Sequence, residues 1–96
     1  MILVVTDQAK KDLSRLDKST RTRVGQALNL MMARPKAADL KKLEGYQDLW
    51  RLRVGEYRVI LQFTPVLDDK EPTGKKEVIT VYALRVINRR EAYRRL

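Results

Sequence analysis

The segment that most constrains the fold is LWRLRVGEYRVILQF, between Leu49 and Phe63, in which two alternating runs of residues are separated by Gly55-Glu56. Alternation with a period of two is typical of β-strands, and Gly at the first central position of a two-residue turn suits a type II′ hairpin. In such a hairpin the numbers of paired residues add up to a constant. The spacing therefore predicts that Arg53 faces Arg58.

This pairing divides the side chains of the hairpin between two faces, because successive residues of a strand point in opposite directions. The apolar face carries Trp50, Leu52, Val54, Tyr57, Val59, Leu61 and Phe63, whereas Arg51, Arg53 and Arg58 project from the other face. Directly opposed like charges destabilise a strand pair by roughly 0.2 to 1 kcal/mol, so we expect an anion to compensate them. A three-residue turn would remove the opposition and leave an ordinary solvated face.

The composition is that of one globular domain spanning residues 1–96, with 44% hydrophobic and 34% charged residues. The formal net charge of +9 favours a nucleic acid, an anionic surface or an acidic protein as the partner.

The sequence contains neither cysteine nor histidine, which excludes disulfides, Cys-His catalysis and the usual zinc sites, and we expect no metal and no cofactor. The N-terminal apolar run extends only over Ile2–Val5, without a preceding basic region, so it does not resemble a signal peptide. No segment approaches transmembrane length. A cytoplasmic location is the default expectation.

Two helices are expected near the N-terminus. Ile2–Val5 suits a buried strand, and Thr6 or Asp7 caps a following helix that buries Ala9, Leu13 and Leu16, leaves Asp12 for solvent, and ends near Asp17-Lys18. Ser19 or Thr20 caps a second helix, which places Val24, Ala27, Leu28 and Met31 on one stripe and ends near Arg34 because Pro35 follows.

The remaining segments complete an α+β order of β-α-α-β-β-β. Residues 35–48 are expected to form a turn of helix and a loop, and residues 64–76 an exposed connection. Glu77–Arg85 is apolar on both faces, as in a central strand, and the C-terminal tail forms a helical turn capped by Asn88. We expect a two-helix layer on one face of a small, mainly antiparallel four-stranded sheet. The arginine face stays open, bordered by the tail and by Lys41 and Lys42.

The element order, the segment LWRLRVGEYRVIL and the ending RVINRREAYRRL together resemble the RelE/ParE superfamily of bacterial toxins from type II toxin-antitoxin modules. The resemblance covers essentially the whole chain. It is closer to the RelE branch, whose members cleave messenger RNA in the ribosomal A site, than to the ParE branch, which poisons DNA gyrase, because Tyr93 and the basic residues are retained.

The resemblance implies a set of site residues. Arg51 and Arg53 match the two basic strand residues of RelE-like active sites, Arg58 matches the arginine after the turn, and Tyr93 matches the C-terminal tyrosine. Either Arg89 or Arg90 matches the basic residue before that tyrosine, and we favour Arg89. Some RelE-like enzymes have lysines at the positions of Arg51 and Arg53; arginine stays protonated, so it binds phosphate but is a poor general base.

These residues imply metal-independent cleavage by attack of the 2′-OH. Tyr93 would act as the general base, with a pKa lowered by the arginines, while Arg53 and Arg58 would clamp the scissile phosphate. Arg51 or Arg89 would assist the leaving oxygen. The alternatives are that Tyr93 only packs the tail and that the arginines form a solvated face. Diffuse RNA contacts are expected from Lys41, Lys42, Arg90 and Arg94.

The implied partners are an acidic antitoxin that wraps the basic face in a hetero-oligomer, messenger RNA in the ribosomal A site, and ribosomal RNA. Two other functions remain open: a gyrase inhibitor of the ParE type, and a nucleic-acid-binding module that does not cleave RNA. The latter predicts a steeply salt-dependent RNA affinity.

Overall fold

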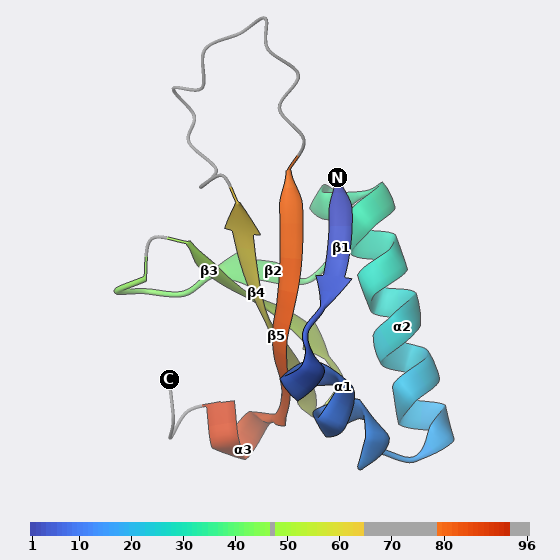
Figure 1. Cartoon of the computed structure of the whole chain (residues 1–96). Helices are drawn as coiled ribbons and strands as arrows, with labels where there is room; N and C mark the ends of the chain where they lie inside the picture. Colours follow the sequence, from blue (N-terminus) through green and yellow to red (C-terminus); the bar gives the residue numbers. More distant parts are fainter. Residues whose placement is uncertain (47, 65–78, 93–96) are drawn as a thin grey trace, which may run out of the picture.

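A computed structural model describes residues 1–46, 48–64 and 79–92 of the chain. The described elements include one sheet whose strand order is β1-β5-β4-β3-β2 (Figure 1). The elements are β1 (Ile2–Val5), α1 (Asp7–Ser14), α2 (Lys18–Ala33), the 3-10 turn η1 (Pro35–Ala37), β2 (Leu40–Lys42), β3 (Leu49–Val54), β4 (Tyr57–Thr64), β5 (Thr80–Asn88) and α3 (Arg89–Ala92).

The α+β class is confirmed, but the sheet has five strands rather than the expected four. The additional strand is β2, which pairs antiparallel with β3 inside the segment that was expected to be a turn and a loop. Three residues are too short to display an alternating pattern, so β2 becomes visible only through its pairing. The sheet is mainly antiparallel, and its one parallel pair joins β1 to β5.

The register of the β3–β4 hairpin is the predicted one, with Val54 paired to Tyr57 and Arg53 paired to Arg58. Gly55 adopts φ +57°, while no described residue other than glycine has a positive φ. A positive φ at the first central position alone agrees with a type II′ turn, whose twist matches that of the flanking strands.

The hydrophobic core lies between the apolar face of the hairpin and the two helices. Val24, Leu28 and Met31 of α2 are buried, as the helical stripe predicted, and Ala9 of α1 belongs to the same cluster. The facing strand residues are Leu52, Val54, Val59, Leu61 and Phe63, and the ring of Trp50 meets Phe63 edge to face at 5.7 Å between centroids. The expected two-helix layer on one face is therefore confirmed, and the arginine face is left on the other side of the sheet.

β1 is an edge strand, and the expectation that it would be buried is wrong, since Ile2 is 52% exposed. The structure selects Thr6 as the N-cap of α1: its hydroxyl oxygen accepts from the Ala9 N–H at 3.2 Å and its O–H donates to the Ala83 carbonyl at 2.9 Å. The N-cap of α2 is Asp17 rather than Ser19 or Thr20. Its carboxylate accepts from the Thr20 hydroxyl, which lowers the pKa of Asp17.

β5 lies inside the sheet, as predicted, between β1 and β4, but runs from Thr80 to Asn88 instead of 77 to 85. β1 covers only its first part. Beyond Ala83, Asp12 of α1 accepts from the Val86 N–H at 2.9 Å and from the Arg85 Nε at 2.9 Å. Asp12 is consequently buried, contrary to the expectation that it faces solvent.

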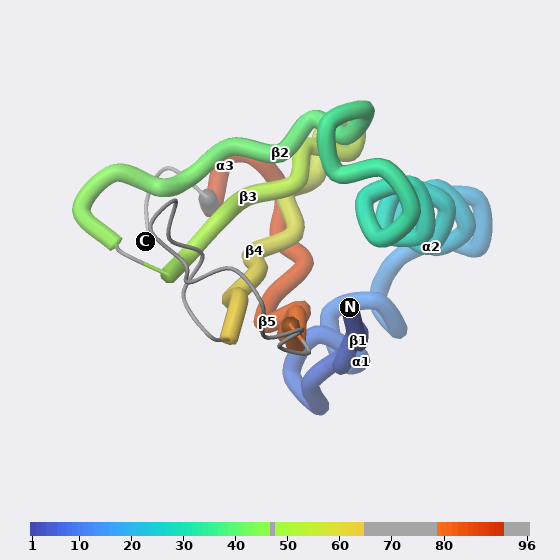
Figure 2. The backbone as a smooth tube through the Cα atoms, turned by 90° about the horizontal axis from the view of Figure 1, so that it is seen from above, coloured from blue at the N-terminus to red at the C-terminus, as the bar shows by residue number. Residues whose placement is uncertain are grey.

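α2 lies to the right of the sheet and α3 at its lower left in Figure 1, and the view from above in Figure 2 again places α2 to the right of the strands. No helix in the part of the chain that the structure describes has the length and apolar character required to cross a bilayer.

Candidate nucleic-acid interface

The sheet face opposite α2, here called the open face, carries two cross-strand rows of cationic residues. Paired residues of neighbouring strands project from the same side. The pairing produces one row of Arg53, Arg58 and Ile87, and a second row of Lys41, Arg51, Ile60 and Arg85. The predicted gathering of Arg51, Arg53 and Arg58 on one face is thus present, together with Lys41 from the newly found strand β2.

The cations of this face differ in their access to solvent. Arg53 and Lys41 are exposed and Arg51 is half-buried, whereas Arg58 is only 3% exposed. The Nη1 of Arg58 donates to the carbonyl oxygens of Gly55 and Tyr57, each at 2.9 Å. The Arg58 Nε is buried and has no hydrogen-bond partner among the residues that the structure describes. Carbonyl dipoles of the turn therefore supply part of the compensation that was expected from an external anion.

Two buried isoleucines are the neighbours of Arg58 on its side of the sheet. Ile87 is its cross-strand partner and Ile60 is the next residue of β4 on the same side, and both are buried outside the main core cluster. A guanidinium between apolar neighbours loses solvent and needs polar acceptors nearby. The open face is therefore not a simple solvated polar face. The sequence carried a signal of this, because β4 and β5 have apolar residues on both sides of the strand.

The start of α3 is attached to the hairpin turn. The Arg89 N–H donates to the Glu56 carbonyl at 2.8 Å, and the Arg89 Nε lies 3.6 Å from the exposed Glu56 carboxylate. Asn88 caps the helix as predicted, since its side-chain oxygen accepts from the Arg90 N–H at 3.1 Å. Arg89 is thus joined to the turn that Arg58 also binds, while Arg90 is exposed. Tyr93 and Arg94 lie outside the described residues.

Arg23 of α2 reaches the same turn, although the sequence offered no reason to select it. Its Nη2 lies 3.0 Å from the position that a Cβ on Gly55 would occupy. Guanidinium groups from α2, β4 and α3 therefore surround the Gly55-Glu56 turn. No local sequence pattern predicts that Arg23 lies beside Gly55, because the contact joins a helix to a hairpin that is distant in the sequence.

Lys42 does not belong to the open face, which corrects its placement beside Lys41. It pairs with Trp50, whose side chain packs on the core side of the sheet, so strand alternation sends Lys42 to that side. Arg85, conversely, belongs to the open face but is engaged by Asp12.

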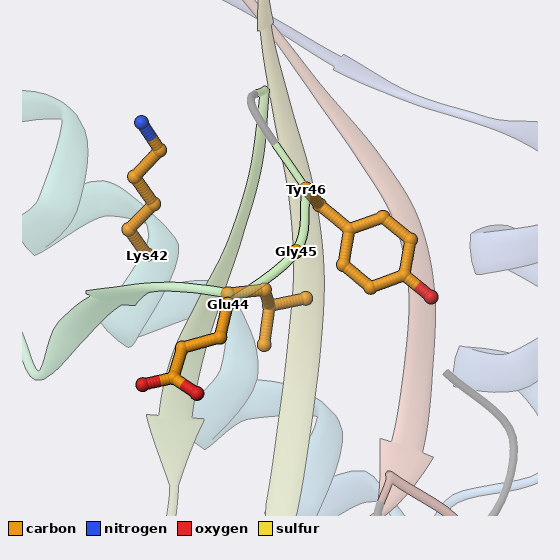
Figure 3. A pocket seen from close by; sticks show the side chains of 5 residues that line it. Lys42, Glu44, Gly45 and Tyr46 are labelled. Atoms are coloured by element: carbon orange, nitrogen blue, oxygen red, sulfur yellow. The ribbon is translucent and has the colours of Figure 1, made fainter.

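A shallow pocket of ≈ 470 Å³ lies at the loop after β2 (Figure 3). Its lining includes Lys42, Leu43, Glu44, Gly45 and Tyr46. The ring of Tyr46 points away from Lys42 and Glu44 in this view. None of these residues had been assigned a site role except Lys42.

Comparisons with known proteins find similarity to toxins of toxin-antitoxin systems. Residues 3–93 match the family described as ParE toxin of type II toxin-antitoxin system, parDE. Solved structures with the same fold include the RelE-RelB complex of Pyrococcus horikoshii OT3 (26% identity, 92% of this chain and 93% of that chain, TM-score 0.63). They also include the RelB-RelE antitoxin-toxin complex of Methanococcus jannaschii (21% identity, 97% and 98%, TM-score 0.64) and the isolated RelE toxin of E. coli (22% identity, 98% and 96%, TM-score 0.62). None of the curated proteins matches the chain.

Proposed function

Since the chain belongs to the ParE toxin family of type II toxin-antitoxin systems, we propose that this toxin is a metal-independent endoribonuclease that cleaves messenger RNA in the ribosomal A site. The observation that carries the proposal is the cationic open face, where Arg51, Arg53 and Lys41 are adjacent in the sheet and accessible from one side. Planar guanidinium groups bind two phosphate oxygens at once, and such groups stabilise charge that develops in a transition state.

The residues of this face have different roles in the proposal. Arg53 and Arg51 contact the scissile phosphate directly, because they are the arginines of β3 that solvent reaches. Arg58 stabilises the turn through its hydrogen bonds to the Gly55 and Tyr57 carbonyls. From this buried position its positive charge attracts the bound phosphate without touching it. Arg58 can bind the scissile phosphate directly only if its guanidinium gives up the hydrogen bonds to those two carbonyls. Arg89, held at Glu56, assists the leaving oxygen electrostatically.

Tyr93 remains the proposed general base, on the strength of the RelE-like ending RREAY. Arginine is always protonated under these conditions and cannot take the proton of the 2′-OH, so a different group is needed. The chain has no histidine, and we assign the role to the phenol of the motif because Tyr93 matches the C-terminal tyrosine of RelE-like toxins. The 2′-OH proton passes to the ionised Tyr93 phenol, the 2′-oxygen forms a bond to phosphorus as the bond to the 5′-oxygen breaks, and the departing 5′-oxygen takes a proton from water. The products would be a 2′,3′-cyclic phosphate, or a 3′-phosphate after hydrolysis, and a 5′-hydroxyl.

The test is a purified translation system in which a programmed message occupies the A site and its 5′ ends are mapped. Arg53→Gln is expected to reduce the cleavage rate by about 10²- to 10³-fold, the typical loss for one transition-state contact. Tyr93→Phe is expected to remove cleavage while keeping ribosome binding. The matched control is Arg34→Gln, which removes one exposed arginine at the C-terminal end of α2. Full cleavage by Tyr93→Phe would contradict the assignment of the base.

The second candidate is a gyrase inhibitor, which the ParE description of the matched family favours. In that case the basic residues steer association with a protein and perform no chemistry. Accumulation of gyrase-bound DNA breaks with intact messages would support this candidate and reject the endoribonuclease. Salt-dependent RNA binding without either effect would indicate a module that only binds RNA.

An acidic antitoxin is the proposed protein partner, since several solved structures with this fold are toxin-antitoxin complexes. The net charge of +9 suits an acidic segment that covers the open face. Cleavage in the translation system should stop when this antitoxin is added in equimolar amount.

A further inference from the structure

The open face changes its chemistry along the strands. Its two cationic rows lie toward the Gly55-Glu56 turn, and the next row consists of the uncharged residues Leu49, Gln62 and Tyr82. Positions two residues apart along a strand are about 7 Å apart, so the charged and uncharged parts are immediate neighbours. One strand of nucleic acid lying along the face would meet both parts.

The loop after β2 extends on the side of the molecule away from α2 (Figures 1 and 2). Both of its ends are anchored. The Leu43 N–H donates to the Leu49 carbonyl at 3.0 Å, and the Asp48 carboxylate accepts from the Gln62 amide at 2.6 Å. Since Gln62 belongs to the uncharged row, the second anchor attaches the loop to the open face itself.

Tyr46 is the large aromatic residue that this loop presents, and it is 41% exposed. A turn positions it: its N–H donates to the Leu43 carbonyl at 3.4 Å, and Gly45 before it adopts φ +81°. Its ring points away from Lys42 and Glu44 (Figure 3). The exposed ring of Tyr46 does not contribute to the hydrophobic core. The aromatic residues of the core are Trp50 and Phe63, which lie on the side of the sheet that faces the helices.

We propose that Tyr46 is a nucleobase-stacking residue, on which one unpaired base of a single-stranded RNA stacks while Lys41 and Arg51 hold the adjacent phosphates. This subsite deepens the proposed function and rests on it. Base–aromatic stacking together with a cationic track is the usual way in which proteins hold single strands, because every base presents a π-face. Because bases differ in stacking strength, Tyr46 would also give a modest bias in which nucleotide lies next to the cleaved bond, which phosphate contacts alone cannot give.

The first test measures binding of a short single-stranded RNA that carries 2-aminopurine, using the change in its emission on stacking. Tyr46→Phe should bind as the wild type does, because the ring is kept. Tyr46→Leu should lose at least about fivefold in affinity, the lower limit for one base–aromatic stack. Leu30→Ser is the matched control, since Leu30 is another large exposed apolar residue, on α2.

The second test maps message ends in the translation system. Tyr46→Leu should still cleave but with altered nucleotide preference at the cut, while Tyr46→Phe should retain the wild-type preference. Unchanged affinity and unchanged preference in Tyr46→Leu would overturn the subsite while leaving the endoribonuclease in place. RNA binding that depends on Tyr46 without any cleavage by the wild type would instead reject the proposed function and retain the subsite. Loss of antitoxin binding alone in Tyr46→Leu would also overturn the subsite, since Tyr46 would then contact protein.

Discussion

Arg53 and Arg58 are direct cross-strand partners, yet Arg53 is exposed and Arg58 is 3% exposed with its guanidinium bound to the carbonyls of Gly55 and Tyr57. One arginine of the pair is therefore available to a ligand, and the other maintains the turn that presents it. Because of this division of roles, substitutions of Arg53 should affect mainly activity and substitutions of Arg58 mainly stability.

Arg53→Gln should lower activity without lowering stability. The substitution removes one of two opposed like charges, whose repulsion costs roughly 0.2 to 1 kcal/mol, so the free energy of unfolding should stay constant or rise by that amount. Urea denaturation measures the stability, and message cleavage measures the activity. A loss of more than 1 kcal/mol would show that Arg53 makes structural contacts beyond those described.

Arg58→Met should have the opposite profile for stability. The side chain keeps its apolar length, but the Gly55 and Tyr57 carbonyls lose a charged donor, and hydrogen bonds from charged groups contribute about 1.5 to 3 kcal/mol. Relief of the buried Nε offsets part of this loss, so we expect a net destabilisation of about 1 kcal/mol. The double variant with Arg53→Gln should show coupling, because the two residues are in direct opposition. Additive effects would contradict the proposed interaction.

Asp12→Ala should be among the more damaging changes outside the main core. It leaves the Val86 N–H at the uncovered edge of β5 without its acceptor and removes the ion pair with Arg85, for an expected loss of about 2 to 3 kcal/mol. Asp12→Asn should cost less, since an amide oxygen still accepts from Val86. Thermal unfolding of the two variants tests this order, and equal losses would assign the effect to the charge alone.

The same carboxylate makes stability sensitive to acid. Burial raises the pKa of Asp12, but hydrogen bonds from the Arg85 guanidinium, the Val86 N–H and the Gln8 amide outweigh it, so the pKa lies below its ordinary value of 3.8. A depressed pKa in the folded state means that the contribution is complete above about pH 4 and is lost as the pH falls through the folded value. Urea titrations between pH 2 and 6 should show this loss in the wild type, with a smaller slope in Asp12→Asn.

Gly55→Ala should destabilise the hairpin for two reasons. Its φ of +57° costs an L-residue about 1 to 2 kcal/mol, and the added Cβ would lie 3.0 Å from the Arg23 Nη2. The arginine end is flexible and can move, so the backbone accounts for most of the loss. Combining Gly55→Ala with Arg23→Ala should therefore restore only a minor fraction of the stability. Full recovery would show that the contact with Arg23, not the backbone, requires glycine.

The sequence was most informative where residues close in the chain interact. The hairpin register and the helical stripe of Val24, Leu28 and Met31 follow from turn geometry and periodicity, which act over a few residues. The N-cap of α1 was narrowed to Thr6 or Asp7, and the structure selects Thr6. The expectation about β1 was wrong because the pattern of an apolar strand does not distinguish a central position from an edge. β2 was missed because its pairing with β3, and not its own three residues, makes it a strand.

The placement of the cations shows the same limit. Alternation by itself determined that Arg51, Arg53 and Arg58 share one face, because side chains of a strand point alternately to its two sides. Only the tertiary structure decided that Arg58 is buried, that Arg23 and Arg89 meet at the same turn, and that Asp12 completes the edge of β5. Burial and long-range contacts depend on which distant segments pack together, and the free energy of that packing is not contained in any local stretch of the chain.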